Sequence, residues 1–194
     1  MLFGVGSGLW ASDQPHAGAS AREIVAFYAD DSAWIVAGAS LSLLSIALFI
    51  FFASGVRAIL REHDEDDLLA MTAFGGALVL VMAGLGAETI NMVGALRAED
   101  GSLSLQLGRS LFEISYVLGY NGAGVGIGTL ILATAAVALR ARALMPRWLA
   151  LLLLVAGLAF ITPLVRFLLG PAVLLLAVVS AHLLRPSRPA PQRT

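Results

Sequence analysis

The sequence predicts an all-α integral membrane protein, a helical bundle with five full transmembrane helices, an N-terminal stub of a sixth and a short outer amphipathic helix. Of the 194 residues, 59% are hydrophobic and 13% are charged, whereas soluble domains are about 45–50% apolar and about 25% charged. The charged residues occur in clumps, and five uncharged runs of about 18 residues or more lie between them, each long enough to cross a bilayer core of about 30 Å. The cations, all of them Arg, gather at the ends of these runs.

The N-terminal region, residues 1–31, precedes the first full span. Residues 1–12 are apolar, too short to span, and lack the positive start of a signal peptide. They are either a re-entrant or interfacial piece or the outer end of a first helix whose start is missing, and we favour the second interpretation. Residues 13–31 form an outer linker, in which Ser20 and Glu23 have the spacing of a capping box before a short interfacial helix. Asp30, Asp31 and Ser32 then offer a cap for the next helix.

The full spans follow from the uncharged runs and from the Pro and Gly residues that interrupt them. Within one transmembrane bundle, residues 1–184, the predicted spans cover residues 33–54, 68–96, 110–139, 147–161 and 171–184, and a cytoplasmic Pro/Arg-rich tail covers 185–194. We expect the loop His63–Asp67 to be solvated and acidic rather than a metal site. Its last acids precede a helix, where the positive end of the helix dipole favours them.

The distribution of Arg residues predicts the orientation in a bacterial plasma membrane. Eight Arg residues fall on the predicted inner side, namely Arg57, Arg61, Arg140, Arg142, Arg147, Arg185, Arg188 and Arg193. Four fall on the outer side, namely Arg22, Arg97, Arg109 and Arg166. This bias puts the C-terminus in the cytoplasm, and a complete first helix would bring the number of spans to six.

Composition also excludes several classes of function. The chain has no Lys and no Cys, which excludes Schiff-base chemistry, a P-loop lysine, thiolate catalysis and iron–sulfur ligation. A formal net charge of −1 argues against a nucleic-acid partner. His16, His63 and His182 fall at different depths, so they cannot ligate a membrane haem together. We therefore predict neither a cofactor nor a metal.

Several short motifs resemble a family of uncharacterised multi-pass membrane proteins, a domain of unknown function common in actinobacteria. They are Ala21-Arg-Glu-Ile-Val-Ala-Phe-Tyr28, Tyr120-Asn-Gly122, Leu144-Met-Pro-Arg-Trp-Leu149 and the terminal Leu-Leu-Arg-Pro. The resemblance covers nearly the whole chain and implies a six-helix topology. Family members usually carry a complete first helix, and here only its outer end is present. No activity is established for the family, so the resemblance brings no catalytic residues.

Two ionisable groups at membrane depth, Glu88 and Glu113, are the main functional candidates. Both fall at a similar outer depth, because Glu88 lies some 20 residues into one span and Glu113 one turn into the next, antiparallel span. Helical spacing puts further polar residues on their faces, namely Asn91, Tyr116, Tyr120 and Asn121, and Arg166 and Arg109 can reach the same level. This set either forms an outward-opening pocket for a ligand or proton, or consists of ion pairs that lock helices together. We favour the ion pairs, since both carboxylates are close enough to the surface to be partly solvated.

Glycines in the third full span predict close helix packing rather than a nucleotide loop. Gly122 and Gly126, and likewise Gly124 and Gly128, have small-xxx-small spacing, and Gly84 lies on the neighbouring span. The alternative is that these glycines leave room for a ligand or a hinge beside Asn121.

Three classes of function remain. The first is a non-enzymatic protein that binds a lipid or small apolar ligand, or a scaffold that docks a second copy of itself or another membrane protein. The second is a small proton-coupled transporter that uses Glu88 or Glu113. The third is an intramembrane enzyme, for which only Tyr116 and Asn91 stand near the acids. We favour binding or scaffolding, because no internal repeat suggests a transporter and no nucleophile or metal suggests an enzyme.

Overall fold

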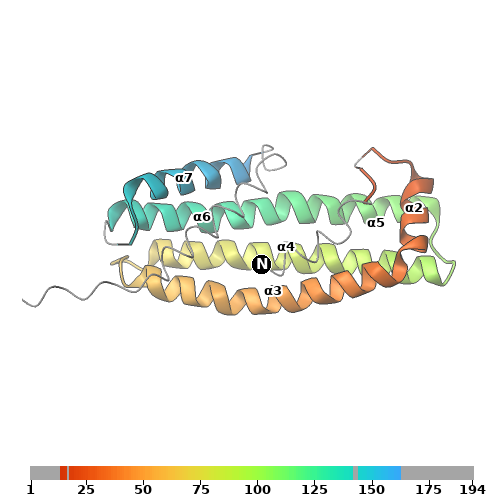
Figure 1. The fold of residues 1–194 in the computed structure, drawn as a ribbon, viewed down its shortest axis with the longest axis horizontal. Coiled ribbons are helices and arrows are strands. Elements are labelled where there is room, and N and C mark those ends of the chain that lie inside the picture. Colours follow the sequence, from red (N-terminus) through yellow and green to blue (C-terminus); the bar gives the residue numbers. More distant parts are fainter. Residues whose placement is uncertain (1–13, 17, 142–143, 163–194) are drawn as a thin grey trace, which may run out of the picture.

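The structure, a computed structural model, describes residues 14–16, 18–141 and 144–162, and all regular elements in these ranges are helical (Figure 1). They are α2 (Ala21–Asp30), α3 (Ser32–Arg61), α4 (Leu68–Glu99), α5 (Leu105–Val117), the π-helical turn η1 (Leu118–Gly122), α6 (Ala123–Arg140) and α7 (Arg147–Ile161). Three long rods lie side by side, formed by α3, by α4 and by the continuous α5–η1–α6 helix, while α2 crosses one end and α7 covers α6 near the other. The predicted all-α class is confirmed.

Three helices are long and apolar enough to cross a membrane. They contain 30, 32 and 36 residues, the last being the continuous stretch Leu105–Arg140. At 1.5 Å per residue even the shortest is about 45 Å long, which exceeds a hydrocarbon core of about 30 Å. The fourth apolar helix, α7, has 15 residues. The predicted stub 1–12 and the predicted span 171–184 lie outside the described residues, so the described part contains three such spans rather than the six of the predicted topology.

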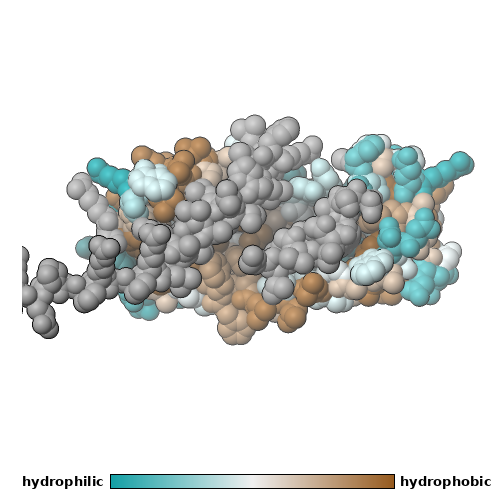
Figure 2. Space-filling view, viewed as in Figure 1, coloured by the Kyte–Doolittle hydropathy of each residue, from teal (hydrophilic) through white to brown (hydrophobic). Residues whose placement is uncertain are grey.

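The surface of the bundle has the polarity expected for a membrane protein. Hydrophilic residues gather toward its two ends, and exposed hydrophobic residues lie between them (Figure 2). Large apolar side chains such as Phe51, Met82 and Val155 are mostly exposed. Trp34 and Trp148 are also exposed, one at the start of α3 and the other at the start of α7, near opposite ends of the bundle. Tryptophan favours the boundary between lipid and water, so these residues are suited to anchor the two ends.

The capping box predicted for α2 is present. The Ser20 hydroxyl accepts a hydrogen bond from the Glu23 amide at 3.3 Å, and the Glu23 carboxylate accepts one from the Ser20 amide at 2.7 Å. These bonds, chiefly the one from the Ser20 amide, lower the pKa of Glu23. Asp31 occupies the N-cap position of α3, within the predicted set Asp30, Asp31 and Ser32, but its side chain makes no capping hydrogen bond. Asp31 is the single residue between α2 and α3, and the chain turns sharply there.

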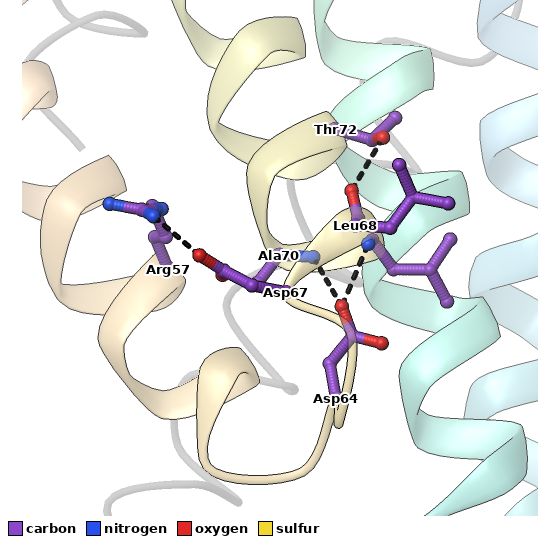
Figure 3. A network of polar contacts seen from close by, with 7 residues as sticks. Arg57, Asp64, Asp67, Leu68, Ala70 and Thr72 are labelled. Atoms are coloured by element: carbon purple, nitrogen blue, oxygen red, sulfur yellow. Dashed lines mark hydrogen bonds and ion pairs between the residues drawn. The ribbon is translucent and has the colours of Figure 1, made fainter.

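The α3–α4 corner is held by two of its acidic side chains (Figure 3). The Asp64 carboxylate accepts hydrogen bonds from the amides of Leu69 and Ala70 at 2.7 and 3.0 Å, and so satisfies donors that the first turn of a helix leaves free. Asp67 adopts a left-handed backbone conformation (φ 53°) and pairs with Arg57 at 2.8 Å. The acids do precede α4 as predicted, but the loop is not simply solvated, because Asp64 is only 7% exposed.

Three of the four predicted spans that the structure describes have bounds that differ from the predicted ones. The first full span continues through Gly55 to Arg61 and the second continues to Glu99, since no Pro interrupts either extension. The third begins at Leu105 instead of 110, because the Ser104 hydroxyl caps it by accepting from the Leu107 amide at 3.2 Å. Only the fourth, Arg147–Ile161, has the predicted bounds.

Glycines let the long helices approach backbone to backbone. A Cβ atom on Gly76 of α4 would lie 2.6 Å from the Leu130 amide nitrogen of α6, and one on Gly126 would collide with the backbone of Leu80. Gly128 packs against Gly157 of α7 in the same way. The other glycines of the predicted packing set are placed as follows: Gly122 faces Ala83 of α4, and Gly84 and Gly124 are buried. Gly76 was not part of that set.

Candidate functional site

Glu88 lies within the apolar part of α4, toward the end of the bundle that α2 crosses. Its side chain is largely buried and lies within hydrogen-bonding reach of the Ser42 hydroxyl of α3. Ser42 itself is fully buried, whereas the neighbouring Ser45 hydroxyl donates to the Leu41 carbonyl of its own helix at 2.9 Å. The Oε2 atom of Glu88 is buried and has no hydrogen-bond partner among the described residues. An unsatisfied buried oxygen is costly, so this atom is where an additional donor would be accepted.

Asn91, one helical turn after Glu88, joins three helices. Its Oδ1 atom accepts hydrogen bonds from the Tyr28 hydroxyl of α2 at 3.1 Å and from the Ser115 hydroxyl of α5 at 2.8 Å. We call Tyr28, Ser42, Glu88, Asn91 and Ser115 the outer polar cluster. Side chains from all four helices α2 to α5 thus meet at one level of the bundle.

Tyr28 enters this cluster because Gly94 leaves space for its ring. A Cβ atom on Gly94 would lie 2.8 Å from the ring, so any larger residue there would displace it. The Tyr28 side chain is 0% exposed. Burial raises the pKa of Tyr28 to about 12, against the opposing effect of its hydrogen-bonding interaction with Ser115. The hydroxyl therefore stays protonated and donates at any physiological pH.

The π-helical turn η1 packs directly against the segment of α4 that carries Glu88. The Leu118 side chain lies 3.2 Å from where a Cβ on Gly86 would be, and a Cβ on Gly119 would lie 3.7 Å from that of Ala87. A π turn contains one more residue than the corresponding α-helical turn and often occurs at functional sites. The irregular backbone of the third span is thus next to the buried carboxylate.

Glu113, the second candidate carboxylate, lies elsewhere. Its side chain is 54% exposed and accepts a hydrogen bond from Arg109 of the same helix at 2.8 Å. This pair belongs to one helix and does not lock two helices together. Glu113 borders a shallow depression with Phe112, Tyr116 and Val117. Glu88 faces α3, so the described residues do not bring the two carboxylates into one pocket.

The remaining predicted site residues are distributed as follows. The rings of Tyr116 and Tyr120 are in contact, with centroids 4.5 Å apart, and Asn121 is exposed within η1. Arg166 lies outside the described residues. Three members of the outer polar cluster were not among the site residues predicted from the sequence, namely Tyr28, Ser42 and Ser115. Gly94, one turn after Asn91, was the available signal of a close approach there.

Within the outer polar cluster, the Glu88 carboxylate is the acceptor that the described contacts leave open. Within the described ranges no group of three or more His, Asp or Glu side chains could hold a metal ion. Asn91 is already engaged by two hydroxyls, which leaves the Glu88 carboxylate as the group able to accept a donor or a positive charge. Comparisons with protein-family models, with curated proteins and with solved structures find no match to this chain.

Proposed function

We propose that this chain is a non-enzymatic binding protein of the bacterial plasma membrane, and that it holds a lipid or small, largely apolar ligand at Glu88. The buried Oε2 atom of Glu88, which has no partner in the part of the chain that the structure describes, carries this proposal. A ligand with a hydrogen-bond donor or a cationic group would supply the missing partner, while its apolar part would remain among the helices. Asn91 is engaged by Tyr28 and Ser115, which favours binding over acid–base catalysis.

The proposed membrane arrangement has six helices, with α2 outside and the C-terminus in the cytoplasm. The bias of Arg residues toward the α3–α4 corner and the C-terminal tail supports this orientation. The resemblance to the uncharacterised actinobacterial family supports the number of helices. In this arrangement Glu88 lies toward the outer leaflet.

A proton-coupled transporter that uses Glu88 is the second candidate. The observation that favours it is η1, because a π turn beside a buried carboxylate is a place where the backbone can change its hydrogen bonding as the carboxylate gains or loses a proton. Glu113 is not required in this version, since it is exposed and paired with Arg109.

Glu88→Gln tests the proposal, and Glu113→Gln is its matched control. The protein is extracted with its surrounding lipid and examined by native mass spectrometry. We expect the wild type and Glu113→Gln to retain a bound ligand of defined mass and Glu88→Gln to lose it. The melting temperature of Glu88→Gln should change little, because glutamine keeps the shape of glutamate and the Ser42 contact and loses only the charge. Retention of that mass by Glu88→Gln contradicts the proposal. If no mass is bound but Glu88→Gln abolishes proton uptake in proteoliposomes, the transporter is favoured.

A further inference from the structure

A shallow depression lies at the α3–α4 corner, at the opposite end of the bundle from Glu88. Ser54, Arg57, Ala58 and Arg61 of α3 and Phe74 of α4 line it. Arg57 and Arg61 are four residues apart, so they are neighbours on one face of α3. We propose that this depression binds the phosphate group of an anionic phospholipid.

The charges around the depression favour an anion. Its lining residues include two guanidinium groups and no carboxylate. Two acids of the corner are engaged within it: Asp64 accepts from the amides of α4, and Asp67 pairs with one terminal nitrogen of Arg57 and offsets part of its charge, as Figure 3 shows. The Nε atom of Arg57 is buried and has no partner among the described residues. Arg61 forms no ion pair within the same ranges.

The guanidinium group of arginine binds a phosphate with more specific geometry than a compact ammonium group does. It is planar and presents several N–H donors in a fork that matches two phosphate oxygens. One terminal nitrogen of Arg57 binds Asp67, which fixes the direction of the side chain, and its Nε atom is buried without a partner among the described residues. Arg61 adds a second guanidinium one turn further along α3.

An apolar surface continues from the depression toward the middle of the membrane. Phe51 lies three residues before Ser54 and seven before Ala58, on the same face of α3, and is 76% exposed. An acyl chain attached to a phosphate at Arg57 and Arg61 would therefore lie along Phe51. This continuity, together with the length of α3, favours a membrane phospholipid over free inorganic phosphate.

Binding of phosphatidylglycerol to the purified full-length protein tests the site, with phosphatidylcholine as the uncharged-headgroup comparison. In native mass spectrometry from mixed micelles, we expect the wild type to bind phosphatidylglycerol more tightly than phosphatidylcholine. Arg61→Gln should weaken phosphatidylglycerol binding about fivefold, since a basic residue near an anionic lipid contributes about 1 kcal/mol. Arg97→Gln, an exposed Arg at the other end of α4, should leave it unchanged.

Arg61→Gln is the primary variant because it breaks no ion pair of the corner. Arg57→Gln also removes the Asp67 pair, so it serves as a second variant whose melting temperature is measured alongside. Equal binding of the two lipids by the wild type, or unchanged binding by Arg61→Gln, overturns the proposal. Displacement of phosphatidylglycerol by an equal concentration of inorganic phosphate also overturns it, since the apolar contact with Phe51 would then contribute nothing.

Discussion

At the scale of single residues, the Tyr28 hydroxyl is the clearest link between the short helix α2 and the three long helices. It donates to Asn91, and its ring occupies the space left by Gly94. A buried hydrogen bond contributes about 1 kcal/mol net. The larger part of its contribution comes from the burial of the ring, which is not exposed at all.

The raised pKa of Tyr28 leads us to expect that the protein loses stability at alkaline pH. Its folded-state pKa of about 12 lies above the ordinary value of 10.0. Its contribution is therefore fully present below pH 10 and is lost as the pH rises through 12. The shift corresponds to on the order of 2–3 kcal/mol. The melting temperature of the wild type, measured by circular dichroism, should fall as the pH rises from about 9 to about 12. This range brackets the ordinary tyrosine pKa of about 10. The fall should be clearly smaller for Tyr28→Phe, and equal slopes for the two proteins would contradict the assignment.

Sequence reasoning found part of the outer polar cluster. Glu88 stood out because a charge at membrane depth is rare, and Asn91 because it follows at i+3. Ser42 did not, because hydroxyls in apolar helices commonly donate to a carbonyl of their own helix, as Ser40 and Ser54 do. Which serine turns to another helix depends on tertiary packing, and a single sequence contains no direct record of it.

At the scale of elements, the contact between α4 and α6 depends on glycine at positions where the backbones touch. Gly76 and its neighbour Gly75 provide a matched pair of positions. A Cβ on Gly76 would lie 2.6 Å from the Leu130 amide nitrogen and 2.8 Å from the Gly126 carbonyl oxygen, whereas a Cβ on Gly75 would meet nothing within 4 Å.

Gly76→Ala should therefore destabilise the bundle by about 1–3 kcal/mol, because a backbone contact cannot yield as a side chain can. Gly75→Ala should be neutral or stabilising by up to about 1 kcal/mol, since alanine favours helix more than glycine does. Denaturant-induced unfolding in detergent micelles distinguishes the two. Equal stability of both variants would show that α4 and α6 are not packed this closely.

Hydropathy predicts where each helix lies along the chain far better than it predicts how neighbouring helices are aligned with one another. The apolar runs placed α3, α4 and α7 within a few residues at most ends, except at the end of α3, where the helix continues through Gly55 to Arg61. The pattern of glycines indicated close packing of the third span, but the partner backbone on α4 is at Gly76 and Leu80. Periodicity along one helix does not specify which level of its neighbour it meets. The π turn was equally invisible, because one additional residue barely changes hydropathy.

At the scale of the whole molecule, the proposed orientation puts the α3–α4 corner and the α4–α5 connection on opposite sides of the membrane. The chain contains no Cys, so single cysteines report their location without background. Glu65 and Ser102 are exposed at these two places. A maleimide that cannot cross the plasma membrane but reaches its outer face should, when applied to intact bacterial cells, label Ser102→Cys and not Glu65→Cys. Permeabilisation should expose both. The reverse pattern would invert the proposed topology.

The single extra residue of η1 has a consequence for how this chain can change in length. Each residue of an α-helix turns it by about 100°, whereas a π turn accommodates one additional residue without rotating the helix beyond it. Ser115 before the turn meets α4 at Asn91, and Gly126 after it meets α4 at Leu80. Removing one residue between 118 and 122 would turn this segment into a regular α-helix and leave both halves facing α4 as they do now. The third span should therefore tolerate a one-residue deletion in this turn more readily than one elsewhere along the helix, where a deletion would rotate one half away from α4.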